Sequence, residues 1–116
     1  MSGAASRRKG NRWELQVCEL LKSYGWQAIT SRAARGGTQA GADIITDAPI
    51  IVEAKNHKQM NLAGWLDQAV EQADNTAPAA LFIKRRQKPS GDCYVVMRAD
   101  DYLRLLRGDY NTECAS

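Results

Sequence analysis

The chain has 116 residues, of which 44% are hydrophobic and 25% charged, and its formal net charge is +3. These values are typical of one soluble globular domain, and they exclude a collagen, a coiled-coil rod and a wholly disordered chain. No window approaches the ~18 consecutive apolar residues of a membrane helix, and no apolar segment follows the basic N-terminus, so we expect no secretory signal.

The first residues differ in composition from the rest of the chain. Residues 1–10 are small, polar and basic, and we interpret them as a flexible basic arm. We expect one domain over residues 11–108 and a frayed C-terminal tail at 109–116.

Periodicity and turn residues predict the element order α-β-β-β-α-β-β-α. Asn11 and Asn61 are the expected caps of the first two helices, and Gly25 ends the first one. This order predicts an α/β fold with a small mixed sheet flanked by helices. The predicted helices are 11–24, 62–74 and 100–106, the predicted strands are 26–31, 42–46, 50–55, 79–84 and 94–98, and a glycine-rich basic loop covers 32–41.

Two acids and a lysine converge on one face of a predicted hairpin. If the hairpin is centred on Ala48, Asp43 lies opposite Glu53, and such partners project from the same face with Cβ atoms about 4.5–5.5 Å apart. Lys55 shares this face because side chains repeat every two residues along a strand. Isoleucines and a valine surround these residues, and like charges in an apolar setting need a counter-ion.

The first predicted helix adds a third acid. Glu14 shares a stripe with the apolar Val17, Cys18 and Leu21, so it points inward, whereas Glu19 is turned toward solvent. An inward glutamate is costly unless a partner compensates it.

Carboxylate oxygens are the preferred ligands of Mg²⁺, which keeps water and phosphate oxygens as its other ligands. The metal would activate water and clamp phosphate oxygens, and Lys55 would orient that water or stabilise charge on the phosphate. The cluster therefore predicts phosphodiester hydrolysis. The alternative is a structural salt-bridge cluster at a sheet edge, in which Lys55 neutralises Asp43 and Glu53.

The basic residues form two groups, at residues 7–12 and 84–88. Separated basic groups on a small domain indicate a polyanionic partner, and solvated surface is the alternative. The three cysteines have no CxxC spacing, and His57 is the one histidine. We therefore expect neither a zinc site nor a disulfide framework, which indicates a reducing, cytoplasmic setting.

The segments RRKGNRWE, YGWQAITSR, GADII, VEAK and AALFIKRR occur in that order within residues 7–98. Over this span the chain resembles the PD-(D/E)XK nuclease superfamily, and within it the archaeal-type Holliday junction resolvases and their bacteriophage relatives. Ala42 stands where the superfamily's name has a proline.

The resemblance implies a single-domain, restriction-endonuclease-like fold and a catalytic set of Glu14, Asp43, Glu53 and Lys55. Asp43, Glu53 and the Ala54 carbonyl would hold Mg²⁺, with Mn²⁺ as a substitute, and Glu14 would complete the site. Gln68 is an accessory candidate or a surface amide. Either Ser31 or Thr38 would be the family's hydroxyl residue.

The function implied is resolution of four-way DNA junctions in recombination and repair, by paired symmetric nicks from a homodimer, in the cytoplasm of a host cell if a phage encodes the chain. The alternatives are a nicking, flap or restriction-like nuclease, and a non-catalytic DNA-binding module. Leu103, Leu105, Leu106 and the last strands are interface candidates, whereas we assign Trp65 to the core. The expected DNA contacts are Arg7, Arg8, Lys9, Arg12, Arg32, Arg35 and Lys58.

Overall fold

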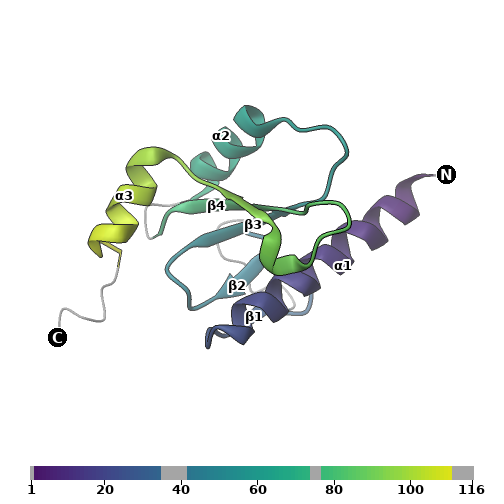
Figure 1. Cartoon of the computed structure of the whole chain (residues 1–116), viewed down its shortest axis with the longest axis horizontal. Coiled ribbons are helices and arrows are strands. Elements are labelled where there is room, and N and C mark those ends of the chain that lie inside the picture. The colour runs from purple at the N-terminus through teal and green to yellow at the C-terminus, as the bar shows by residue number, and fades with distance from the viewer. Residues whose placement is uncertain (1, 35–41, 74–76, 111–116) are drawn as a thin grey trace.

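The elements of the computed structural model follow the predicted order (Figure 1). The structure describes residues 2–34, 42–73 and 77–110, so Arg35, Thr38 and Cys114 lie outside the described residues. A short 3₁₀ helix, η1, is added after β4. The elements are α1 (Ser2–Ser23), β1 (Ala28–Thr30), β2 (Ile44–Thr46), β3 (Ile51–Lys55), α2 (Leu62–Gln72), β4 (Ala79–Ile83), η1 (Ser90–Asp92), β5 (Tyr94–Val96) and α3 (Ala99–Arg107).

The five strands form one mixed sheet in the order β1-β2-β3-β4-β5. Neighbouring strands are antiparallel except β3 and β4, which are parallel and are connected through α2. Asn61 caps α2 as predicted, because its side chain accepts a hydrogen bond from the Gly64 N–H. The predicted α/β architecture, consistent with a restriction-endonuclease-like fold, is confirmed.

The sheet is covered on both faces (Figure 1). The α1 side chains Trp13 and Val17 pack in one cluster with Val52 and Phe82, whereas Ala69 of α2 packs on the other face. All five residues of β4 are buried. This explains the uninterrupted apolar sequence of β4, because a strand covered on both faces has no polar side.

The first helix begins earlier than the sequence predicted. It starts at Ser2 and continues through Asn11, which therefore does not cap it. The predicted arm contains Ala, Arg and Lys, which have high helix propensity, and no proline, so the helix extends through it and beyond the sheet (Figure 1). Gly25 ends the helix as predicted, with a φ of +99° that favours glycine.

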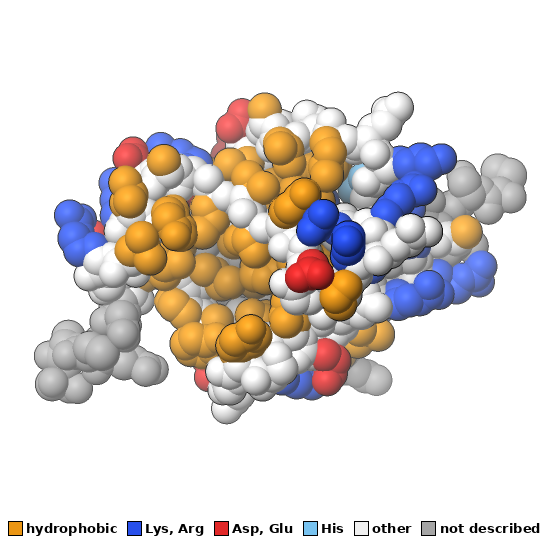
Figure 2. All heavy atoms as spheres, in the orientation of Figure 1, with side chains coloured by type: hydrophobic (Ala, Val, Ile, Leu, Met, Phe, Trp, Pro, Cys, Tyr) orange, Lys and Arg blue, Asp and Glu red, His pale blue; other side chains and the backbone are white. Residues whose placement is uncertain are grey.

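The last helix leaves an apolar stripe at the surface. Asp101 is the buried residue of α3, whereas Tyr102, Leu103 and Leu106 are exposed. Figure 2 shows hydrophobic side chains spread from α3 across the face of the molecule. None of the described helices is long and apolar enough to span a membrane. Cys18 and Cys93 are free thiols.

Candidate active site

Asp43 and Glu53 lie close together where β2 pairs with β3. The register pairs Ile44 with Val52, which is symmetric about Ala48 as predicted. The Asp43 N–H donates to the Val52 carbonyl at 3.1 Å, so Asp43 and Ile44 both lie opposite Val52, and the regular pairing does not extend to Asp43. The register at Ile44 is as predicted, but the ladder does not pair Asp43 directly with Glu53. The two carboxyl groups are nevertheless close, because a hydrogen bond with Asp43 and the Asp43 charge both raise the pKa of Glu53.

Hydrogen bonds hold Asp43 by both its side chain and its main chain. Its Oδ2 accepts a hydrogen bond from the Ala54 N–H at 2.8 Å, and its carbonyl accepts one from the Ser31 N–H at 2.9 Å. The Ser31 hydroxyl donates to the Ala42 carbonyl. Ser31 thus fixes the backbone that carries Asp43. Thr38, the other candidate for the family's hydroxyl residue, lies outside the described residues.

Glu53 lies in a setting that disfavours its charge. Burial and the negative charge of Asp43 raise the pKa of the Glu53 carboxyl to about 7, and the Lys55 charge offsets only part of this rise. A hydrogen bond with Asp43 and the charge of Glu14 raise it further. The carboxylates are therefore close enough to need a shared proton or a cation.

Lys55 lies on the same strand face as Glu53. Its Nζ is 5.5 Å from the ring centre of Trp65 on α2, and the His57 ring lies 5.1 Å from the same indole. Trp65 packs against the core cluster beneath α2, as predicted. A cation–π contact positions an ammonium without cancelling its charge, so Lys55 remains available to an anionic substrate. His57 is exposed.

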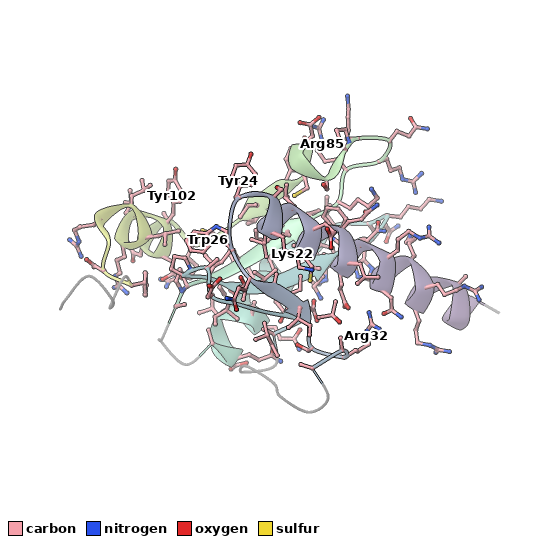
Figure 3. All side chains as sticks on the ribbon, turned by 90° about the horizontal axis from the view of Figure 1, so that it is seen from below. Lys22, Tyr24, Trp26, Arg32, Arg85 and Tyr102 are labelled. Atoms are coloured by element: carbon pink, nitrogen blue, oxygen red, sulfur yellow. The ribbon has the colours of Figure 1, made fainter. Side chains whose placement is uncertain are left out.

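Glu14 faces inward from α1, as predicted. Its side chain is 18% exposed and forms an ion pair with the Arg32 guanidinium at 3.0 Å, and Figure 3 shows Arg32 alongside α1. Burial raises the pKa of the Glu14 carboxyl, the hydrogen bond from Arg32 lowers it, and the charge of Asp43 raises it. Glu14 is therefore electrostatically linked to the site, and Arg32 partly neutralises it.

The donor atoms fit a small divalent cation. Within the described ranges no three His, Cys, Asp or Glu side chains are arranged to hold one metal ion. Mg²⁺ needs only one or two protein carboxylates and takes its other ligands from water and phosphate. Asp43 and Glu53 supply two carboxylates with excess negative charge. The Ala54 carbonyl faces the same strand edge as its N–H, beside Asp43, so the set is compatible with Mg²⁺.

The predicted DNA contacts are distributed over several elements. Those on α1 form part of a helix rather than an arm, and Lys58 follows β3; these side chains are exposed. Gln68, the accessory candidate, is exposed on α2. Arg32 pairs with Glu14. The described α1 residues in question are Arg7, Arg8, Lys9 and Arg12.

The sequence analysis placed Trp65 in the core and named Ser31 as a candidate hydroxyl residue, but it did not predict the supporting contact that each one makes. The cation–π partner of Lys55 is Trp65, and the positioning residue behind Asp43 is Ser31. The signal for Trp65 was available, because α2 follows β3 and crosses over the face that carries Lys55. The role of Ser31 depends on how β1 pairs with β2, and no local pattern reports that contact.

One comparison with known proteins matches almost the whole chain. A family described as "Phage putative PDDEXK endonuclease" matches residues 5–114. No curated protein and no solved structure matches.

Proposed function

Because the chain belongs to this family of phage PD-(D/E)XK endonucleases, we propose that it is a structure-selective endodeoxyribonuclease that resolves four-way DNA junctions. The family makes the chain a nuclease; the junction as substrate is the proposal. The observation that supports hydrolysis most directly is the closeness of the Asp43 and Glu53 carboxyls, with the Lys55 charge acting on the same group.

The chain's own residues suit the bond-breaking step. Asp43, Glu53 and the Ala54 carbonyl would hold Mg²⁺, or Mn²⁺ in its place, which supplies charge stabilisation on phosphate oxygens and lowers the pKa of an attacking water. The Lys55 Nζ would donate to a scissile phosphate oxygen, where negative charge develops. Glu14 would complete the site by orienting water, with Arg32 adjusting its charge.

The surface charges support recognition of DNA shape. The exposed residues that the sequence predicted as DNA contacts include four on α1 and Lys58 after β3, and contacts to phosphates position DNA without reading its sequence. Such contacts suit an enzyme that distinguishes a branch from a linear duplex. We accordingly assign the exposed Arg7, Arg8, Lys9, Arg12 and Lys58 to phosphate contacts.

Junction resolution requires two symmetric cuts, and therefore a two-fold homodimer. Support comes from α3, where Ala99, Tyr102, Leu103 and Leu106 follow the i, i+3, i+4, i+7 spacing of one helix face and are exposed. We call this set the α3 apolar face. An apolar face of this kind marks an interaction site, and a second copy of the chain is the occupant that paired cleavage needs.

The test is cleavage of an immobile four-way junction in Mg²⁺, with a linear duplex of the same sequence alongside. Symmetric nicks in the junction alone are expected. Asp43→Asn, Glu53→Gln and Lys55→Ala should each abolish cleavage while junction binding survives. His57→Ala is the matched control, because His57 lies on the same face beside Trp65. It should cleave within about twofold of wild type, because an exposed substitution of this kind leaves the fold and the proposed metal, water and phosphate contacts in place.

Two results would contradict this proposal at different levels. Cutting of flaps or linear duplex in preference to the junction would refute the junction as substrate and favour another nuclease activity. Tight junction binding with no cleavage in Mg²⁺ or Mn²⁺ would favour a binding module whose acids form a structural cluster.

A further inference from the structure

A basic cleft lies between α1 and the segment that follows β4. Its volume is about 490 Å³, and we call it the α1–β4 cleft. Among the described residues its lining combines cations with side-chain amides and contains no acid. Figure 2 shows Lys and Arg side chains gathered at the end of the molecule where α1 begins. The polar side chains of the lining include Lys9, Arg12, Gln16, Asn56, Lys84 and Arg86.

The cleft and the carboxylate pair lie on opposite faces of the sheet, at the C-terminal end of β3 and β4. Lys55 is the register partner of Ile83, and the Lys84 N–H donates to the Lys55 carbonyl at 3.0 Å. Side chains alternate along a strand, so Lys84 is turned to the face opposite Lys55. Accordingly Lys84 lies over Trp13 of α1, whereas Lys55 lies over Trp65 of α2.

The positive charge of the cleft is held in place and is not neutralised by acids. The Lys84 Nζ is 5.1 Å from the ring centre of Trp13. That indole is buried, and its Nε1–H donates to the Phe82 carbonyl at 3.0 Å, so the ring is a fixed platform. Over the described ranges no cleft cation enters an ion pair, whereas Lys22, Arg32, Arg98 and Arg107 each do.

We propose that the α1–β4 cleft binds a DNA backbone phosphate other than the one aligned with Asp43 and Glu53. Lysine and arginine form the stronger, charge-assisted hydrogen bonds to phosphate oxygens, and the Asn56 and Gln16 amides add neutral donors. The inference rests on the proposed action on DNA. The cleft adds a contact on the second face of the sheet, so DNA that engages both contacts passes around the C-terminal end of β3 and β4.

The test measures binding separately from cleavage. Each variant is made on an Asp43→Asn background, and the affinity for a labelled four-way junction is measured in EDTA over a range of NaCl concentrations. Lys84→Gln and Arg86→Gln should each weaken binding about tenfold, the effect of removing one charge-assisted hydrogen bond, and should lower the slope of log K against log salt by about 1. Lys22→Gln, which removes the same charge from exposed α1 surface, should change neither.

A second measurement is independent of substitutions. In ¹⁵N-labelled protein, the Asn56 side-chain amide and the Trp13 indole N–H signals should shift on titration with a short DNA oligonucleotide. Shifts with inorganic phosphate but none with DNA would overturn the proposal, as would binding of Lys84→Gln and Arg86→Gln equal to that of Lys22→Gln. A wild type that never cleaves, but whose DNA binding depends on Lys84 and Arg86, would refute the nuclease proposal and leave the cleft assignment standing.

Discussion

Glu53 has Asp43 and Lys55 as its charged neighbours, and their opposite effects on the pKa of the Glu53 carboxyl do not cancel. The Asp43 charge raises the pKa of the Glu53 carboxyl and the Lys55 charge lowers it, yet the value still reaches about 7 because burial adds to the rise. An uncharged residue at this position would favour folding at least as well as Glu53 does. The ionised form of Glu53 is therefore unfavourable in the metal-free site, and a bound cation would stabilise it.

This imbalance predicts how the stability of the metal-free protein depends on pH. The folded-state pKa of about 7 lies above the ordinary glutamate value of 4.5, so the native state holds the proton more tightly than the unfolded state. The free energy of unfolding should fall as pH rises through this window and level off above it. Glu53→Gln should remove the fall, and at pH 8 should be roughly 1–2 kcal/mol more stable than wild type, after allowance for partial solvent screening.

Urea unfolding at pH 5 and pH 8 in EDTA measures this difference. Glu19→Gln is the control, because Glu19 is exposed on α1, and it should follow the wild type at both pH values. A Glu53→Gln variant that parallels the wild type across the pH range would contradict the electrostatic description of the site. Adding MgCl₂ at pH 8 should stabilise the wild type by mass action and the variant less.

The sequence was sufficient to place the acids but not their supports. Asp43 and Glu53 were predicted because strand alternation and a turn at Ala48 determine their register, and both signals are local. The ion pair between Glu14 and Arg32 depends on how α1 packs beside β1, and the hydrogen bonds from Ser31 depend on how β1 pairs with β2. Such contacts join residues that are distant in the chain, and no periodicity encodes them.

At the scale of the element, α1 shows a competition between a local start signal, the predicted N-cap Asn11, and the helix propensity of the residues before it. Asn11 is a favourable cap, but the residues before it include Ala, Arg and Lys, which extend a helix readily. The cap signal therefore predicted a boundary that the helix does not have. The strands and the other helices begin and end within a few residues of prediction, because turn residues interrupt their apolar patterns.

The helical extension changes what the basic residues can do. Arg7 and Arg8 lie on a helix that continues beyond the sheet (Figure 1), so their side chains have a defined spacing. Arg7→Gln with Arg8→Gln should weaken junction binding and lower the salt slope by roughly 2, one unit for each phosphate that is no longer neutralised. The melting temperature should stay unchanged, because both side chains are exposed. An unchanged salt slope would remove this part of α1 from the DNA interface.

The basic surface near the start of α1 and the exposed apolar surface near α3 lie apart on the molecule. In Figure 1 the start of α1 and the helix α3 lie at opposite ends, and the basic cleft is at the α1 end. Figure 3 shows Tyr24, Trp26 and Tyr102 on one side of the molecule, where two cavities share Val95 in their lining. A second copy docked on this apolar side would leave the basic surface of each protomer free for DNA.

Exposed leucines of α3 would lie at the interface between two protomers. Leu103 and Leu106 are 60% and 65% exposed, so replacing both with Glu should leave the fold intact but place like charges across a two-fold interface. Light scattering should then report the monomer mass of 12.8 kDa for the variant and twice that mass for wild type. Leu15→Glu, at a leucine of α1 that is 56% exposed, is the matched control and should remain dimeric.

The same variant links assembly to the two cuts. On a supercoiled plasmid that extrudes a four-way junction, a dimer makes both nicks within one encounter and gives linear product, whereas a monomer nicks once and dissociates, giving nicked circles. The double variant should shift the product from linear to nicked while single-strand cleavage persists, because its carboxylate site is untouched. A variant that stays dimeric would place the interface elsewhere, and a monomeric wild type that still gives linear product would refute the dimer.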